Sequence, residues 1–303
     1  MSDPVEPELP RGVALAWGIA AAPQRGPKRE MSVERIVEAA VEIADADGLA
    51  AVSMAAVANK LGYTPMSLYR YVTAKDDLIL LMQEEATGLP SDATREGTWR
   101  EQLEKLYAEQ VARYLEHPWV LDVPISGSPA TPNSAAWMDA GLRALSSTGL
   151  SFNERLSVML EVTGQARWTG SVVAGYARTQ QEEGLTDAEI ARREDELFRS
   201  LISADEYPHL RAAIEAGVFV ADGDPFAFGL ARALDGVAAY IDRIDAGAEH
   251  EAMPVWYSPD DADVLDDKKY REARKAVHAA EKALRDARRA ARQTAREARE
   301  RRH

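Results

Sequence analysis

The stretch that decides the fold is MAAVANKLGYTPMSLYRYV, residues 54–72. Small and apolar residues recur in it at helical spacing, and Gly62 interrupts them in the way that ends a helix. Thr64 and Pro65 then start a second pattern, with proline in the first turn, where a helix tolerates it. Two short helices joined by a three-residue turn that contains glycine are typical of a helix-turn-helix. We therefore expect residues 64–72 to form a recognition helix.

Apolar residues on either side of this pair extend it into a small helical module. A supporting helix starts with Ser32 as its N-cap and ends at Gly48. A fourth helix starts at Thr73, with Asp76 three residues on as a shorter form of the capping-box acid. A helix as short as the predicted recognition helix is not stable alone, so apolar side chains must pin it to its neighbours. We assign this role to Val57, Leu61, Leu68 and Val72.

The opposite face of the recognition helix carries groups that suit DNA. Serine, threonine and tyrosine hydroxyls bond phosphates or base edges without adding charge, and arginine reaches either. Proline and methionine can touch thymine methyl groups, and a lysine at a helix start favours phosphate. The candidates are Thr64, Pro65, Met66, Ser67, Tyr69, Arg70, Tyr71 and Lys75, with Arg25, Lys28 and Arg29 on an upstream arm that can enter a minor groove. Such a module can also be plain helical packing, and the residues alone leave both interpretations open.

Composition and charge limit the class of protein. Of the 303 residues, 46% are hydrophobic and 28% charged, and none is cysteine, which indicates a soluble globular chain without disulfides or thiolate zinc sites. The net charge of −14 is uneven, at −3 for residues 24–87, −16 for residues 88–265 and +7 for residues 266–303. An acidic chain does not coat nucleic acid indiscriminately, so we expect any DNA contact to be local.

No motif of an enzyme, metal site or membrane protein is evident. The sequence has no Gly-rich phosphate loop, no G-x-S-x-G and no H-E-x-x-H, and its five histidines are scattered without clustered acids. No apolar run approaches the length of about 18 residues that a membrane span needs. We therefore expect a cytoplasmic protein with no catalytic activity, no metal, no cofactor and no membrane partner.

The remaining patterns predict an all-α protein with four parts. Residues 1–30 form a proline-bearing arm, residues 31–87 the helix-turn-helix domain, residues 88–250 an acidic helical bundle and residues 251–303 a charged helical extension. A helix that starts near Trp99 ends at Pro118, and residues 118–133 are expected to be a loop. Further helices are expected at about 134–147, 152–182, 187–202, 206–216 and 225–247. The basic extension is open to three interpretations, namely a solvated helix, a phosphate contact or a helix that pairs with a partner.

Residues 31–87 closely resemble the DNA-binding domain of the tetracycline-repressor (TetR) family of bacterial transcription regulators. The resemblance rests on RIVEAAVEIADADGLAAVSMAAVANKLGYTPMSLYRYVTAKDDLI, residues 35–79, and HPWV at 117–120 is similar to the subgroup with a tetracycline-repressor-like C-terminal domain. It implies that Met66 and Ser67 read bases, that Tyr69, Tyr71 and Lys75 contact phosphates or adjoining bases, and that Ser53 and Met54 belong to the interface. One departure is that alanine stands at positions 55 and 56, where arginine is common.

The same resemblance implies a bundle that forms a homodimer and binds a small-molecule inducer. For the dimer interface we expect Gly164, Gly170, Val173, Gly175, Phe228, Ala231, Ala233, Leu234, Val237, Ala238 and Tyr240. For the ligand we expect Trp99, Trp119, Trp137, Met138, Met159, Gln165, Trp168 and Tyr176, because indoles line pockets for flat molecules. The hypothesis is a repressor that leaves a palindromic double-stranded operator when an apolar or aromatic inducer binds. A regulator without an inducer, and an architectural protein acting through its basic extension, remain alternatives.

Overall fold

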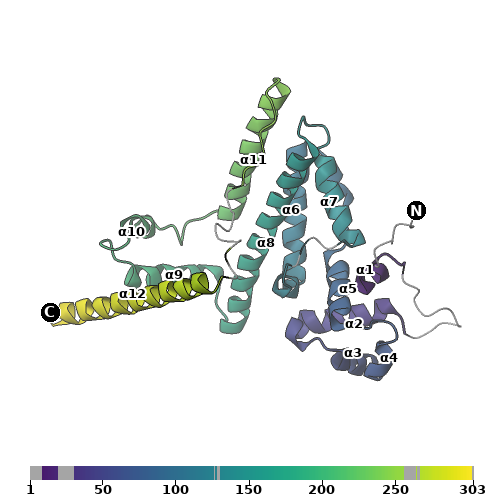
Figure 1. Ribbon diagram of the computed structural model, residues 1–303, viewed down its shortest axis with the longest axis horizontal. Coiled ribbons are helices and arrows are strands. Elements are labelled where there is room, and N and C mark those ends of the chain that lie inside the picture. The colour runs from purple at the N-terminus through teal and green to yellow at the C-terminus, as the bar shows by residue number, and fades with distance from the viewer. Residues whose placement is uncertain are drawn as a thin grey trace. The chain divides into compact units, whose positions relative to one another are not determined.

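The computed structural model describes residues 9–19, 31–125, 127, 130–255, 264 and 267–301, and every regular element in these ranges is helical (Figure 1). The chain divides into two compact units, Met1–His250 and Glu251–His303, and the second contains α12 (Lys268–Glu300). Arg25, Lys28 and Arg29 lie outside the described residues. Among the described residues, no helix combines the length and the apolar composition that crossing a bilayer requires. The all-α fold class is confirmed.

The N-terminal module contains the predicted helix-turn-helix. Its helices are α2 (Val33–Asp47), α3 (Met54–Leu61), α4 (Pro65–Leu68) and α5 (Lys75–Thr87), with the 3-10 turn η1 (Leu49–Ala51) after α2. Ser32 caps α2 as predicted, since its hydroxyl accepts from the amide of Arg35 at 3.3 Å. The prediction for the recognition helix was too long, because regular helix ends at Leu68 and only a turn continues to Val72.

The start of α5 corrects a second prediction. Its N-cap is Ala74, not Thr73, and no side chain caps the helix. The Thr73 hydroxyl instead donates to the carboxylate of Asp77 at 3.2 Å. The other oxygen of Asp77 accepts from the amide of Gly12 at 2.9 Å, so this carboxylate serves neighbouring segments rather than the helix end.

A short helix in the N-terminal segment packs onto α5. This helix, α1 (Arg11–Ala16), approaches so closely that a Cβ on Gly12 would lie 2.9 Å from both Asp77 Oδ1 and Leu80 Cδ2. The indole of Trp17 then donates to the carbonyl of Ala130 at 2.8 Å. Glycine is therefore required at position 12 for α1 to seat on α5.

The bundle follows the module in the same unit. It contains α6 (Trp99–Glu116), α7 (Pro132–Ala144), α8 (Phe152–Glu183), α9 (Asp187–Leu201), α10 (Pro208–Glu215) and α11 (Pro225–Asp245), with 3-10 turns η2 (Asp92–Arg95) and η3 (Pro118–Asp122). The predicted helices of this region are confirmed with ends within three residues, whereas η3 occupies the start of the predicted loop. The long helix α8 lies beside α6 and α7 (Figure 1). The hydrophobic core of the bundle includes Leu103, Leu106, Leu145, Val162, Leu230 and Leu234.

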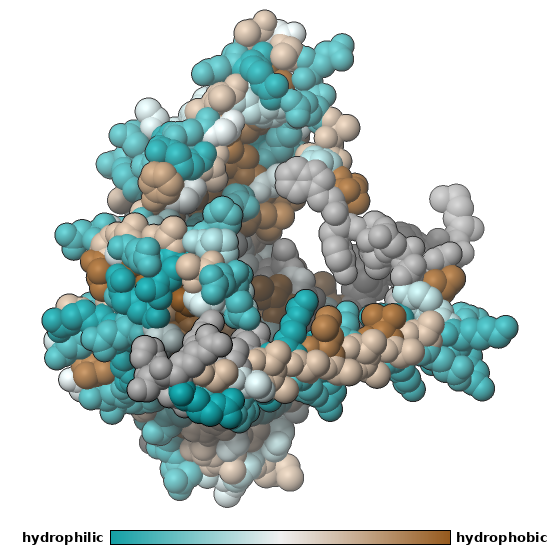
Figure 2. Space-filling model, turned by 90° about the vertical axis from the view of Figure 1, so that its left-hand side faces the viewer, coloured by the Kyte–Doolittle hydropathy of each residue, from teal (hydrophilic) through white to brown (hydrophobic). Residues whose placement is uncertain are grey.

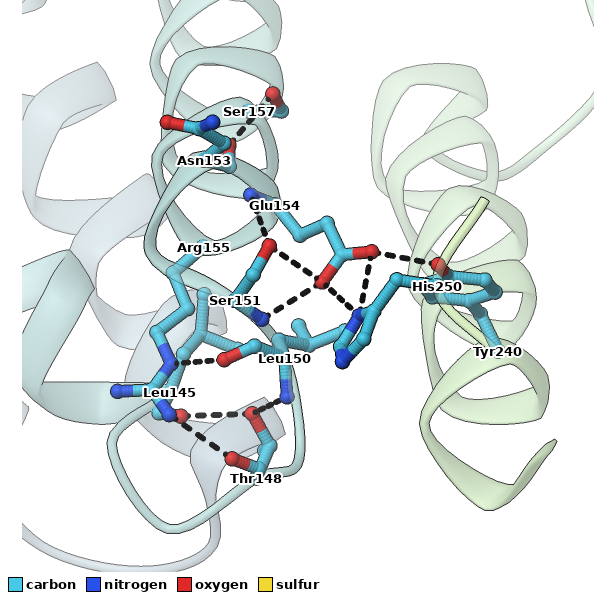
Figure 3. Close-up of polar contacts among 10 residues, drawn as sticks. All are labelled: Leu145, Thr148, Leu150, Ser151, Asn153, Glu154, Arg155, Ser157, Tyr240 and His250. Atoms are coloured by element: carbon cyan, nitrogen blue, oxygen red, sulfur yellow. Dashed lines mark hydrogen bonds and ion pairs between the residues drawn. The ribbon is translucent and has the colours of Figure 1, made fainter. Parts of the chain in front are cut away.

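Glu154 fastens the start of α8 to α11 (Figure 3). The hydroxyl of Tyr240 on α11 donates to this carboxylate at 2.5 Å, and Nδ1 of His250 lies 2.9 Å from its other oxygen. Ser151, the N-cap of α8, donates to it from both its amide and its hydroxyl at 2.7 Å. Burial would raise the pKa of Glu154, but the hydrogen bonds from Tyr240, Ser151 and His250 outweigh it and hold the pKa at about 2.

Candidate nucleic-acid interface

The turn between α3 and α4 sets the recognition segment at a fixed angle to its support. Gly62 adopts a left-handed conformation, φ 75° and ψ 29°, which side chains other than glycine rarely accept. Pro65 occupies the first turn of α4, and the hydroxyl of Ser67 donates to the carbonyl of Thr64 at 2.6 Å. Leu68 and Val72 are fully buried, which confirms that they anchor the segment. The exposed residues around α4 are thereby held outward by the buried anchors.

Most of the predicted DNA-contacting side chains are exposed. Met66 is 72% exposed and Tyr69 is 43% exposed. Ser53, Thr64, Pro65, Arg70 and Lys75 are also exposed, whereas Ser67 and Tyr71 are half-buried. Met54 differs, because its side chain is buried in the module core. Met54 can therefore contact a phosphate through its backbone amide, which lies in the first turn of α3 after the N-cap Ser53.

Few cations in this module are free to meet phosphate. Lys60 on α3 is paired with Glu42 at 2.8 Å. Among the described residues, Arg70 and Lys75 have no carboxylate partner. Lys75 also lies at the start of α5, which has no side-chain cap but carries Asp76 and Asp77 in its first turn. Ala55 is exposed and Ala56 half-buried, so α3 presents methyl groups at the two positions where arginine is common in the resembling family.

A hydrogen-bonded link joins this module to the bundle. Asp45, in the last turn of α2, accepts from the indole Nε1 of Trp119 at 2.7 Å and lies 2.8 Å from Nδ1 of His117. His117 is the C-cap of α6, and Trp119 in η3 is 2% exposed within the module core. The sequence analysis did not single out Asp45. The available signal was its position, since a carboxylate is unfavourable near a helix C-terminus unless a partner holds it.

The structure does not gather the predicted ligand residues at one place. Trp119 belongs to the module core, and Trp168 and Tyr176 are exposed on α8. Trp137 and Met159 are buried in the bundle, where the indole of Trp137 donates to the carbonyl of Gly88 at 2.9 Å. Trp99, Met138 and Gln165 are half-buried. Trp137 and Met159 are therefore the members of the set whose side chains are buried in the bundle.

Polar side chains between α6 and α8 form a buried group that the sequence analysis missed. The hydroxyls of Tyr107 and Thr169 lie 2.9 Å apart, and burial raises the pKa of Tyr107. The amide nitrogen of Gln110 reaches the hydroxyl of Thr163 at 3.5 Å, while its amide oxygen is buried without a partner among the described residues. A buried unpaired acceptor is costly, so Gln110 can orient a donor that enters the bundle.

No metal site accompanies these groups in the part of the chain that the structure describes, since no three histidine or carboxylate side chains come together there. The candidate interface consists of hydroxyls, Arg70, Lys75 and helix N-termini presented by one module, with a hydrogen-bonded link from that module to the bundle. Such an arrangement can bind a phosphate backbone and base edges.

Known proteins share both parts of this architecture. Residues 36–82 match the model of bacterial regulatory proteins of the tetR family, and residues 89–241 match the tetracycline repressor-like C-terminal domain. The chain is 36% identical over 244 residues to the HTH-type transcriptional repressor DrrR1 of Streptomyces coeruleorubidus, covering 77% of this chain and 87% of the relative. It is 30% identical over 194 residues to an HTH-type transcriptional regulator of Saccharopolyspora erythraea, covering 64% and 77%.

Among solved structures, the complex of Streptomyces coelicolor ActR with actinorhodin has a TM-score of 0.59 at 22% identity. It covers 71% of this chain and 98% of ActR. A possible TetR family regulator from the same organism has a TM-score of 0.56 at 23% identity, covering 69% and 100%. These likenesses establish the shared fold.

Proposed function

Because this chain belongs to the TetR family of helix-turn-helix transcription regulators, we propose that it is a cytoplasmic repressor that binds a palindromic operator as a homodimer. We propose further that it leaves the operator when a small apolar or aromatic molecule enters the bundle. The family is non-enzymatic. The observation that carries the proposal is the exposed surface around α4, with Thr64 before the helix and Tyr69 after it, over the buried anchors Leu68 and Val72.

The dimer follows from the geometry that an operator demands. Two recognition helices related by a twofold axis read half-sites about one helical turn apart. Leu160, Gly164, Trp168 and Gly175 fall at helical spacing on one open face of α8; Leu160 and Trp168 are 52% and 60% exposed. Phe228 on α11 is exposed as well. We propose these surfaces as the interface between subunits.

The residues predicted for the dimer interface differ in how far they are buried. Gly164 and Gly175 have open space around them, but a Cβ on Gly170 would lie 2.8 Å from Tyr114 Cβ, so Gly170 packs inward against α6. Leu234 is buried in the bundle core, and Tyr240 bonds Glu154. Val173, Ala231, Ala233, Val237 and Ala238 are half-buried. The small residues of α8 therefore serve both the bundle core and the proposed interface.

The proposed binding of a small molecule is based on residues inside the bundle. Gln110 offers an unpaired acceptor between α6 and α8, and the apolar side chains of Trp137 and Met159 are buried in the same bundle. A site with apolar walls and few polar groups suits a small aromatic molecule. The solved complex of ActR with actinorhodin supports small-molecule binding by this fold.

Two contacts can carry a ligand signal to the DNA-binding face. Trp137 bonds the carbonyl of Gly88, the C-cap of α5, and Lys75 stands at the other end of α5. Asp45 joins α2 to His117 and Trp119. We propose that displacement of Trp137 or of the end of α6 shifts these helices together, because both contacts are direct hydrogen bonds.

The operator half can be tested with duplexes that the purified protein selects from a random library. We expect an inverted repeat with half-site centres about one helical turn apart. Tyr69→Ala should weaken binding to it at least tenfold, because a phosphate or base contact is lost. Tyr207→Ala is the matched control, since Tyr207 is 44% exposed on the bundle against 43% for Tyr69. Equal effects of the two variants, or selection of no common sequence, would contradict the proposal.

The sensing half can be tested with a panel of aromatic small molecules, followed by release of the selected duplex and quenching of tryptophan fluorescence. Gln110→Leu should preserve folding and duplex binding, because it removes a buried unpaired acceptor, but should weaken the response to an active compound. Gln102→Leu, also on α6, is the control. If no compound releases the duplex, the repressor without an inducer becomes the better description.

A further inference from the structure

Helix α12 (Lys268–Glu300) has a one-sided charge pattern that the proposed repressor mechanism does not use. Residues 266–303 carry a net charge of +7 in a chain whose total is −14. Helical spacing places seven exposed cations along one face, with Glu281 as an acidic residue among them. They are Arg271, Arg274, Lys275, Lys282, Arg285, Arg288 and Arg289. None of the seven is in an ion pair among the residues that the structure describes.

The opposite face of α12 is almost entirely alanine. Val277 and Leu284 are its large aliphatic residues among those with described side chains, at 58% and 52% exposed. Figure 2 shows this pattern on the rod at lower right, with tan and brown side chains in a row and teal ones along its edges. Alanine gives a thin seam for a coiled coil, and a helix that enters a bilayer surface needs bulky apolar residues. The basic face is therefore the better-developed surface.

We propose that α12 is a second DNA-contacting element, whose basic face lies against the phosphate backbone of duplex DNA. This inference rests on the proposed DNA-binding function and adds a sequence-independent contact to it. From Arg271 to Arg289 the face extends over eighteen residue steps, or about 27 Å at ~1.5 Å per residue. A duplex carries one negative charge per ~1.7 Å, so each of the seven cations has phosphates within reach.

The remainder of the chain has little positive charge available for binding DNA. Lys60 is paired with Glu42, which leaves Arg70 and Lys75 as unpaired cations among the described residues of the α3–α5 surface. Residues 88–265 carry a net charge of −16 and repel DNA. Phosphate neutralisation supplies much of the affinity of DNA-binding proteins. A basic helix therefore compensates for a module that is poor in charge.

The test compares two charge-matched variants of the full chain. Arg285→Gln/Arg289→Gln removes two cations from the basic face, and glutamine preserves the helix. Arg178→Gln/Arg192→Gln removes two exposed cations from α8 and α9. Binding is measured across salt concentrations on a selected operator and on a random-sequence duplex, with circular dichroism to check helicity.

We expect the α12 variant to bind both duplexes about tenfold more weakly in ~0.1 M salt, and to lower the slope of log affinity against log salt by about 2. The Arg178/Arg192 control should match the wild type. Equal loss on both duplexes distinguishes a phosphate contact from base reading, which Met66→Ala, at a position where the family resemblance implies base reading, would affect on the operator alone.

The inference fails if the α12 variant and the control bind alike while the wild type binds DNA. It also fails if DNA binding is unchanged but the variant loses pelleting with phosphatidylglycerol vesicles, or changes its mass in solution, since the face then serves a membrane or a second copy. A wild-type chain that binds no duplex at any salt concentration overturns the proposed function itself.

Discussion

Asp45 lies at a position that is unfavourable for a carboxylate in an isolated helix. It is in the last turn of α2, where the helix dipole opposes negative charge. The fold offsets this cost with hydrogen bonds to His117 and to the buried indole of Trp119. A locally unfavourable residue thus becomes the link between the DNA-binding module and the bundle.

Asp45→Ala should lower the free energy of unfolding by about 1–3 kcal/mol, because the buried Trp119 N–H loses its acceptor. Asp47→Ala is the matched control, since Asp47 is an exposed carboxylate in the same turn and should change stability by less than about 0.5 kcal/mol. Urea denaturation of both variants measures the difference. Similar losses would show that the link contributes nothing specific.

The burial of single residues was predictable wherever local spacing determines it. Leu68 and Val72 are buried as the helical pattern indicates. The location of Trp119 was not predictable, because spacing shows that a tryptophan turns inward but not which of two cores it joins. The carboxylate of Asp77 bonds Gly12 across 65 positions, a long-range contact that local pattern does not show. For the same reason the unpaired amide oxygen of Gln110 became visible only in the fold.

At the scale of elements, α8 and α11 are fastened at one end by Glu154 (Figure 3). Both helices were predictable from periodicity, and the Ser151–Glu154 capping box marks the start of α8 in the sequence. The participation of Tyr240 and His250 required the fold, because both lie more than 80 positions away. A residue recognisable as a local cap therefore also joins two helices.

Glu154 should make the stability of the bundle sensitive to acid. Its pKa falls from an ordinary value of 4.5 to about 2 on folding, so the folded state binds this proton more weakly than the unfolded state. The stabilisation is fully present above about pH 4.5 and is lost as the pH falls toward 2. Glu154→Gln should reduce stability at pH 7. It should also make the decrease in stability between about pH 4.5 and pH 2 smaller, which thermal unfolding at a series of pH values would measure.

Glu161→Gln is the control for that experiment, because Glu161 is an exposed carboxylate on the same helix. It should leave both the stability at pH 7 and the acid profile unchanged. If Glu154→Gln gives the same profile as wild type, the carboxylate does not contribute through its charge.

At the scale of the whole molecule, the open face of α8 should hold two copies of the chain together. Trp168→Glu places a charge on this face and should shift the mass in solution from twice 33.2 kDa toward the single chain. Met66→Glu is the reciprocal control, since Met66 is exposed on the DNA-binding face and its variant should stay dimeric while losing the operator. Analytical ultracentrifugation distinguishes the two, and a dimeric Trp168→Glu protein would place the interface elsewhere.

The pairing of Lys60 with Glu42 has a consequence for how such a protein finds its target. Because Lys60 is in an ion pair, the DNA-contacting surface of α3–α5 should have a low affinity for non-target sequences. Electrostatic attraction to phosphate provides most of the affinity for DNA of any sequence. A complex formed through this surface with non-target DNA should then be short-lived. Through this surface alone, the search along a chromosome should proceed by many short encounters, whereas the proposed contact of α12 holds every sequence equally and should keep the protein near the DNA between them.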